Sequence, residues 1–250
     1  MNDAGARLHI IDSPGGWRSR AFDTLLRLAS PGHRLQDADL LRLRRRYEAL
    51  TGYAGTSVAP PGPGDALLVV DMQRDFLPGG SLAVAGSEAI LGPVNACIDH
   101  FRAHGLPVLA SRDWHPPNHG SFKAQGGPWP PHCVAGTPGA DFPADLALPR
   151  TGLVVSKGCK PEHDAYSAFD GTDLHRQLRA LRVNRLFVAG LATDYCVLAS
   201  VLGARARGYS VVLLRDAVAA VDINPGDGTL ALARMAAAGA VAVDSTALPH

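Results

Sequence analysis

Three residues that could do chemistry together end or closely follow apolar runs of the sequence. Asp71 ends the run LLVVD, Lys157 ends LVVSK, and Cys196 follows LFVAGL after a short polar turn. A thiol is a nucleophile, a carboxylate can take its proton, and an ammonium can balance the charge. The three residues lie far apart in the chain, so only a folded sheet could bring them together. The set suggests a covalent hydrolase.

Cys196 stands close to where a helix is expected to begin. Thr193 can cap a helix that starts at Asp194, which would place Cys196 in its first turn. Free N–H groups at a helix N-terminus favour a thiolate and can hold an oxyanion. The alternative is a buried, inert cysteine. Cys133, which follows His132 and could be a metal ligand, is the main rival thiol.

A second group of residues has the composition of a metal site. Asp113 and His115 are two positions apart, and His119 and His132 follow in residues 114–151, a stretch rich in Pro, Gly and His. Aspartate with two histidines suits zinc, iron or manganese. Single Asp and His residues in loops are usually solvated, so the D-x-H pair alone is a weak signal that the further histidines strengthen. Long loops in compact domains are usually functional.

From residue 65 onward, short apolar strands alternate with amphipathic helical stretches. The pattern predicts strands over 66–71, 107–115, 152–158, 185–191, 210–217 and 240–245, and helices over 87–105, 173–183, 194–208 and 227–239. This alternation indicates an α/β fold with a parallel sheet covered on both faces. Ligands bind beyond the carboxyl ends of such strands. Asp71, Asp113, Lys157 and Cys196 all fall at or just after such ends.

The chain divides near residue 64. We expect residues 1–64 to be a small helical N-terminal extension with a Pro/Gly-rich linker, and residues 65–250 to be the hydrolase domain. Helical spacing of apolar residues recurs over 21–29 and 37–53. The run Arg42–Arg46 would allow a nucleic-acid-binding module, but a solvated helix face explains it more simply.

Composition sets bounds on the class of protein. The 250 residues are 46% hydrophobic and 19% charged, with a formal charge of +1, so nothing draws the whole chain toward nucleic acid or membrane. We expect no membrane span and no signal peptide. The four cysteines lack paired spacing, which predicts reduced thiols and a cytoplasmic location.

Several runs resemble the nicotinamidases and pyrazinamidases of the isochorismatase-like cysteine hydrolase superfamily. The matching runs, between about Ala66 and Ser245, are VVDMQRDFLPGGSLAV, ASRDWHPPNHGSF, WPPHCVAGTPGADF, SKG, YSAF and VAGLATDYCV. In this order they are highly specific. The D-x-H and WPPHC elements matter most, because isochorismatases lack that metal set.

The resemblance implies a three-layer α/β/α sandwich with a mostly parallel sheet and a defined set of site residues. The implied catalytic triad is Asp71, Lys157 and Cys196. The implied ligands of a divalent zinc, iron or manganese ion are Asp113, His115 and His132, with His119 matching a fourth ligand that only some members use. The implied oxyanion hole is formed by Ala192 and Cys196, after a cis peptide between Leu191 and Ala192. The implied pyridine pocket is lined by Phe76, Trp129, Tyr166 and Tyr195.

The resemblance also implies a reaction. A metal-dependent nicotinamidase of NAD salvage would hydrolyse nicotinamide to nicotinate and ammonia through a thioester on Cys196. The alternative is a metal-free amidohydrolase of the same superfamily acting on another small amide, and the D-x-H set with His132 argues against it. Beyond its small-molecule substrate we expect no nucleic-acid or membrane partner. The family's tendency to oligomerise suggests a homo-oligomer.

Overall fold

A six-stranded parallel sheet forms the centre of the structure, a computed structural model that describes residues 58–149 and 152–248. The strands lie in the order β3-β2-β1-β4-β5-β6, and each neighbouring pair is parallel. They are β1 (Asp65–Val70), β2 (Val108–Asp113), β3 (Leu153–Lys157), β4 (Arg185–Leu191), β5 (Ser210–Ala219) and β6 (Val241–Val243). The expected parallel α/β fold is confirmed.

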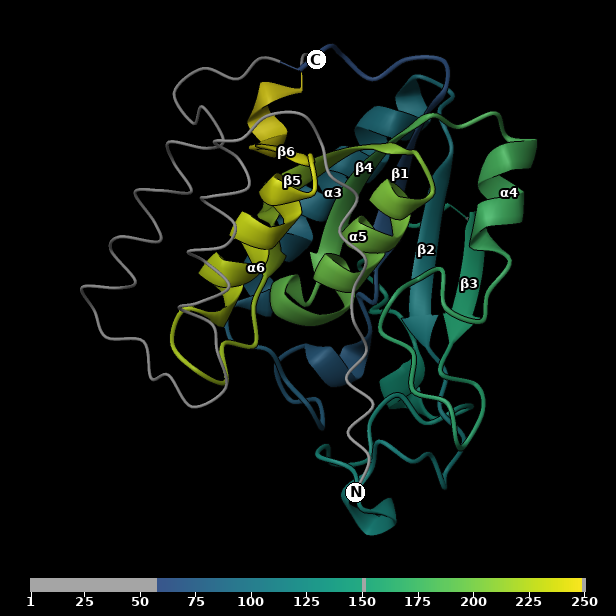
Figure 1. Ribbon diagram of the computed structural model, residues 1–250, viewed down its shortest axis with the longest axis vertical. Coiled ribbons are helices and arrows are strands. Elements are labelled where there is room, and N and C mark those ends of the chain that lie inside the picture. The colour runs from purple at the N-terminus through teal and green to yellow at the C-terminus, as the bar shows by residue number, and fades with distance from the viewer. Residues whose placement is uncertain (1–57, 150–151, 249–250) are drawn as a thin grey trace, which may run out of the picture.

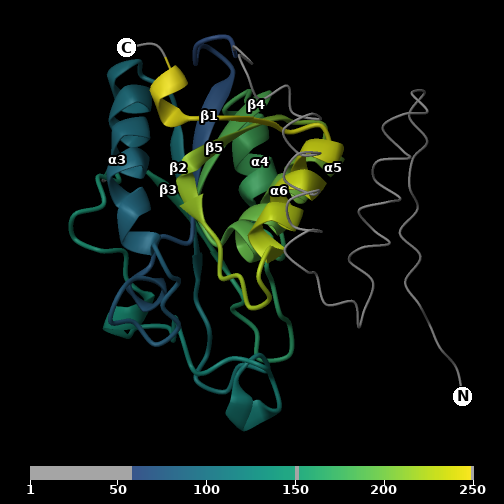
Figure 2. The ribbon, with the colours of Figure 1, turned by 90° about the vertical axis from the view of Figure 1, so that its left-hand side faces the viewer.

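Helices cover both faces of this sheet. The α-helices of the described residues are α3 (Ser87–Ala103), α4 (Leu174–Ala180), α5 (Leu198–Ala206) and α6 (Asp227–Ala237). Helix α3 lies on one face, and the other three lie on the opposite face (Figure 2). The sheet is therefore the middle of three layers, as expected from its continuous apolar strands.

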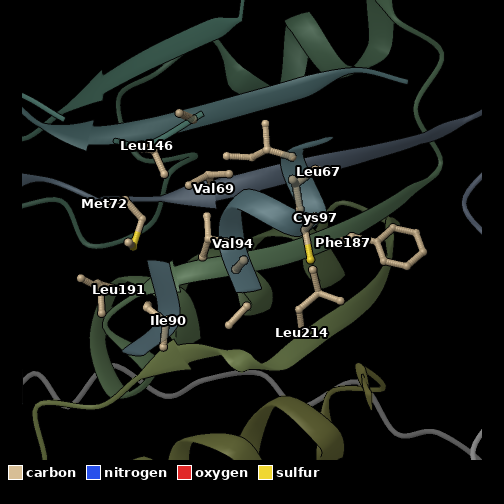
Figure 3. Close-up of a cluster of buried hydrophobic side chains, with 14 of the residues drawn as sticks. Leu67, Val69, Met72, Ile90, Val94, Cys97, Leu146, Phe187, Leu191 and Leu214 are labelled. Carbon is tan, nitrogen blue, oxygen red and sulfur yellow. The ribbon is translucent and has the colours of Figure 1, made fainter. Parts of the chain in front are cut away.

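Alternation along the strands divides the core into two layers. All six residues of β1 are buried. Leu67 and Val69 pack in the cluster that includes Val94 of α3, as Figure 3 shows, whereas Leu68 and Val70 belong to the cluster on the other face. Successive side chains of a strand point to opposite faces, so a strand between two helical layers must be apolar throughout.

The strand order reverses beside β1, and this determines where a crevice can form. From β1 the chain builds the sheet outward through β2 to β3, then returns to β4 on the other side of β1. In such doubly wound sheets the connections diverge at the reversal and leave a crevice at the carboxyl ends of the two strands. Asp71 directly follows β1, and Cys196 follows β4.

The long connection between β2 and β3 lies at this carboxyl end, toward which the arrowheads of β2 and β3 point in Figure 1. It contains two short 3-10 turns, Lys123–Gln125 and Pro138–Ala140, and short bridges that pair His115 with Val134 and Phe122 with Trp129. The strand itself ends at Asp113 and does not continue to His115, so the strand predicted over 107–115 is two residues too long at this end.

Two expectations from the sequence concern parts of the chain that the structure does not fully describe. The predicted helices over 21–29 and 37–53, with the arginine run, lie outside them. Within residues 58–149 and 152–248, no helix is both long enough and apolar enough to cross a membrane.

Candidate active site

The structure brings Asp71, Lys157 and Cys196 together around one ammonium group. Lys157 Nζ lies 2.8 Å from Asp71 Oδ2, 2.6 Å from Asp113 Oδ1 and 3.2 Å from Cys196 Sγ. Lys157 is only 1% exposed, so these contacts replace water for its charge. Asp113 ends β2 and Lys157 ends β3, whereas Asp71 directly follows β1 and Cys196 lies in the turn after β4. All four therefore lie at the carboxyl ends of the strands.

Asp71 is held beside the thiol by contacts with Ser111 and Lys157. The backbone at Asp71 has φ 46, in the left-handed region that aspartate tolerates better than most residues. Its Oδ1 accepts a hydrogen bond from Ser111 Oγ at 2.8 Å. Oδ2 is ion-paired with Lys157 but lies outside good hydrogen-bonding angles to it. An oxygen of Asp71 lies within 4.8 Å of Cys196 Sγ, which places the carboxylate next to the thiol as a candidate base.

Burial sets the proton affinities of this group. It raises the pKa of the Asp71 carboxyl, and raises the pKa of the Cys196 thiol well above its usual value, while the Lys157 ammonium opposes both shifts. Burial alone would lower the pKa of Lys157, but Asp113 and Asp71 raise it well above its usual value. A neutral thiol thus adjoins a carboxyl group of raised proton affinity, which suits proton transfer between them.

Cys196 lies in a turn that differs from the predicted helix start. Residues Thr193–Val197 form a single π-helical turn that precedes α5, and Ala192, not Thr193, occupies the N-cap position without a side-chain cap. Ala192 O accepts hydrogen bonds from the N–H groups of Tyr195 (3.1 Å) and Val197 (3.0 Å), on either side of Cys196. The wide turn is typical of functional sites. The peptide bond between Leu191 and Ala192 is cis, as expected.

Three side chains form a set that could hold a metal ion. Ligand atoms of Asp113, His115 and His132 lie within 4.8 Å of one another, and all three residues are buried. His115 Nδ1 lies 3.0 Å from Gly158 O, and His132 Nδ1 lies 2.9 Å from Pro130 O. Because a carbonyl only accepts, each Nδ1 carries the hydrogen, so Nε2 of each ring in its neutral form keeps a lone pair for a metal. The donor set therefore fits a divalent metal.

His119 is not part of this set among the described residues. Its ring stacks on His115 with centroids 4.1 Å apart. Its Nδ1 lies 2.7 Å from Ser121 Oγ and its Nε2 lies 3.2 Å from His163 O. Both ring nitrogens thus have partners, and Nε2 donates to a carbonyl, so the structure gives His119 no lone pair toward the other three ligands.

The rival thiol lies apart from this chemistry. Cys133 is fully buried in the apolar cluster on the α3 side, and burial raises the pKa of its thiol. Its N–H donates to Asp75 Oδ2 at 2.7 Å, and the N–H of Ser81 donates to Asp75 Oδ1 at 3.2 Å. Asp75 therefore holds two loops in place.

A pocket opens beside the thiol. It has about 430 Å³ of empty space, part of it open to solvent. It is lined by Phe76, Leu82, Val84, Asp113, Trp129, His132, Tyr166, Leu191, Ala192, Tyr195, Cys196 and Val221. All four aromatic residues expected from the sequence line it. Trp129 Nε1 donates to Tyr166 OH at 3.2 Å, and the rings of Trp129 and Tyr195 meet edge to face with centroids 5.3 Å apart. These contacts make a rigid, largely apolar slot for a small planar molecule.

Sequence reasoning missed four residues that shape this site. Gln73 holds the backbone of Asp113, with its Oε1 accepting from Asp113 N and its Nε2 donating to Asp113 O, both at 2.7 Å. Ser111 donates a hydrogen bond to Asp71, Val221 lines the pocket, and Asp194 accepts a hydrogen bond from Val221 N. A polar residue within a buried strand was the available signal for Ser111, and a position shortly after a strand end was the signal for Val221.

A parallel α/β sandwich with these groups at the carboxyl ends of its strands is the isochorismatase-like fold. The chain belongs to the isochorismatase family, since residues 65–247 match the Isochorismatase domain.

Named relatives and solved structures show which members of the family the chain resembles. The chain is 40% identical over 199 residues to the nicotinamidase of Escherichia coli, a match that covers 71% of this chain and 93% of the relative. It is similar to the pyrazinamidase of Pyrococcus horikoshii in complex with zinc, with TM-score 0.70 and 47% identity over 73% of this chain and 99% of the other. It is also similar to PnC1 from L. infantum in complex with nicotinate, with TM-score 0.71 and 42% identity over 76% and 98%.

Proposed function

We propose that the protein is a nicotinamidase, which hydrolyses nicotinamide to nicotinate and ammonia, a reaction of NAD salvage. One observation carries the proposal: a thiol, a carboxylate and an ammonium adjoin an Asp-His-His set in a pocket lined by aromatic rings. The E. coli relative bears the name nicotinamidase, and the L. infantum structure holds nicotinate. All four cysteines are free, in keeping with a cytoplasmic location.

The first half of the reaction forms a thioester. Asp71 takes the proton of the Cys196 thiol as Sγ attacks the carboxamide carbon, and the electron pair of the C=O bond moves to oxygen. The N–H groups of Ala192 and Cys196 stabilise that oxyanion. When the C–N bond breaks, Asp71 returns its proton to the nitrogen, and ammonia leaves.

The second half restores the thiol. Asp71, again a carboxylate, takes a proton from water as the water oxygen attacks the thioester carbonyl. The C–S bond then breaks, and Asp71 gives the proton back to Cys196 Sγ. The product leaves as nicotinate once its remaining carboxyl proton is lost to water. Lys157 remains an ammonium throughout. Its contacts with Asp71 and Cys196 hold both reacting groups in place and offset their negative charge.

The pocket determines how the substrate ring lies. Trp129, Tyr166 and Phe76 enclose a flat ring, and Asp113 with His132 lies on the wall beside the thiol. Asp113, His115 and His132 would hold a divalent zinc, iron or manganese ion, which would supply a Lewis acid able to bind a pyridine nitrogen. The aromatic walls orient the ring so that the carboxamide faces Cys196 Sγ.

Ammonia release from nicotinamide, compared with benzamide, tests the proposal. Benzamide has the same carboxamide and ring shape but lacks the ring nitrogen. We expect turnover of nicotinamide, and a kcat/KM for benzamide lower by about 100-fold, as when a buried polar site loses its partner. Failure to release ammonia from nicotinamide would refute the function, and equal rates would refute the recognition of the ring nitrogen.

A further inference from the structure

Asp194 lies two residues before Cys196 and has no part in the proposed chemistry. Its two carboxylate oxygens bind backbone N–H groups of a distant loop. Oδ1 accepts from Val221 N and Oδ2 accepts from Asp222 N, each at 2.9 Å. Hydrogen bonds to an ionised carboxylate are about twice as strong as neutral ones. The turn that carries the thiol is thus fastened to the connection between β5 and α6.

A second link fastens the other end of this connection. Asp222 has φ 50, and its Oδ1 accepts a hydrogen bond from Gly228 N at 2.7 Å, in the first turn of α6. Position 228 must be small here, since a Cβ on Gly228 would lie 2.6 Å from Ala220 Cβ. The loop over residues 220–226 is therefore tied to the turn of Cys196 on one side and to α6 on the other.

The loop contributes one wall of the pocket. Val221 lines the same pocket as Cys196. It follows β5, whereas the aromatic residues of the pocket come from other segments of the chain. The next residues, 222–225, are exposed, and Ile223 at the loop tip is 57% exposed. Val221 packs against the apolar core, but the residues after it bury little apolar surface, so the hydrogen bonds help to hold the loop down.

We propose that Asp194 is a positioning residue that holds Val221 against the substrate ring and so sets substrate affinity. This rests on the proposed function only in the choice of substrate. Releasing the loop moves an apolar wall away from the ring without changing the thiol, carboxylate or ammonium. We expect the effect to appear in KM, because losing a contact made equally in the ground and transition states raises KM and leaves kcat unaltered.

The test compares Asp194→Asn, Val221→Ala and the double variant in the full chain. Asparagine keeps the shape but turns one acceptor into a donor that faces a backbone N–H. Loss of one charged hydrogen bond predicts a KM for nicotinamide raised about tenfold, with kcat within about twofold. If Asp194 acts through Val221, the two KM effects will be less than additive in the double variant.

A second measurement does not depend on activity. Amide hydrogen exchange over residues 220–222 should quicken in Asp194→Asn and stay unchanged in Val221→Ala. Asp216→Asn is the matched control, because Asp216 accepts from the N–H and hydroxyl of Ser245 (2.7 and 2.6 Å) away from the pocket. It should alter neither KM nor exchange at 220–222.

Two outcomes would overturn the proposal. One is unchanged exchange at residues 220–222 in Asp194→Asn. The other is a fall in kcat with KM unchanged, which would mean that Asp194 acts on the turn of Cys196. If the wild type released no ammonia from nicotinamide, the proposed function would fail, whereas the exchange result would still decide whether Asp194 holds the loop.

Discussion

At the scale of single residues, Lys157 organises the site. Its ammonium contacts Asp71, Asp113 and Cys196 at once, so the group that would act as base and a candidate metal ligand share one cation. Against burial, the same ammonium and His115 hold the pKa of Asp113 below its usual range, which keeps that carboxylate ionised as a ligand.

Ser111 should influence the pKa of Asp71, the proposed base. Its hydroxyl stabilises the ionised Asp71, so Ser111→Ala should raise the pKa of Asp71 further. Because the reaction needs the carboxylate, activity falls as pH drops through that pKa. The acid limb of kcat/KM should therefore move to higher pH, by about one unit for one charged hydrogen bond. A pH profile checks this, with Ser87→Ala in α3 as the buried control. An unmoved limb in Ser111→Ala would exclude Asp71 as the base.

At the scale of elements, the ends of β1 and β2 are joined by one side chain. Gln73, fully buried, binds both backbone groups of Asp113 and also donates to Ala140 O at 2.9 Å. Gln73 thereby fixes Asp113, one of the three candidate metal ligands, relative to β1 and to the connection between β2 and β3.

Gln73→Ala should weaken metal binding without removing a ligand. Loss of a group that orients a ligand typically lowers metal affinity about 10- to 100-fold. Chelator competition would measure this, and Gln125→Ala, an exposed change in the connection between β2 and β3, should leave affinity unaltered. Equal affinities for the Gln73 variant and the wild type would contradict the role given to Gln73.

Much of the arrangement of strands and helices was predictable from the sequence. Apolar runs predicted the strands, and their polar ends predicted that Asp71, Lys157 and Cys196 would meet, because parallel strands share a carboxyl edge. The π-helical turn and the partners of His119 were not predictable, since they depend on where loops cross in space. Asp194 is a further case, because its partners lie 27 and 28 residues away and are backbone groups that no sequence pattern marks.

At the scale of the whole molecule, the isochorismatase match and the site residues fall within residues 65–247. The match to the P. horikoshii structure covers 99% of that chain but only 73% of this one. That protein therefore forms the fold without a counterpart to the remaining part of this chain. We propose that residues 1–64 are an extension apart from the hydrolase domain.

Removal of residues 1–57 should leave catalysis intact. The described residues 58–149 and 152–248 contain the sheet, its helices and every proposed site residue, so kcat/KM for nicotinamide should stay within about threefold of the full chain, a change below 1 kcal/mol. Circular dichroism of the shortened chain would check that it folds. A folded but inactive product would show that the extension contributes to the site.

The central claim is that Cys196 forms the covalent intermediate, and ammonia release by Cys196→Ala tests it most directly. Cys133→Ala, which removes the rival thiol, is the matched control. With metal content equal in both variants and the wild type, we predict that Cys196→Ala loses turnover by at least about 10⁴-fold, whereas Cys133→Ala retains it. Ammonia release by Cys196→Ala at a rate near that of the wild type would contradict the account.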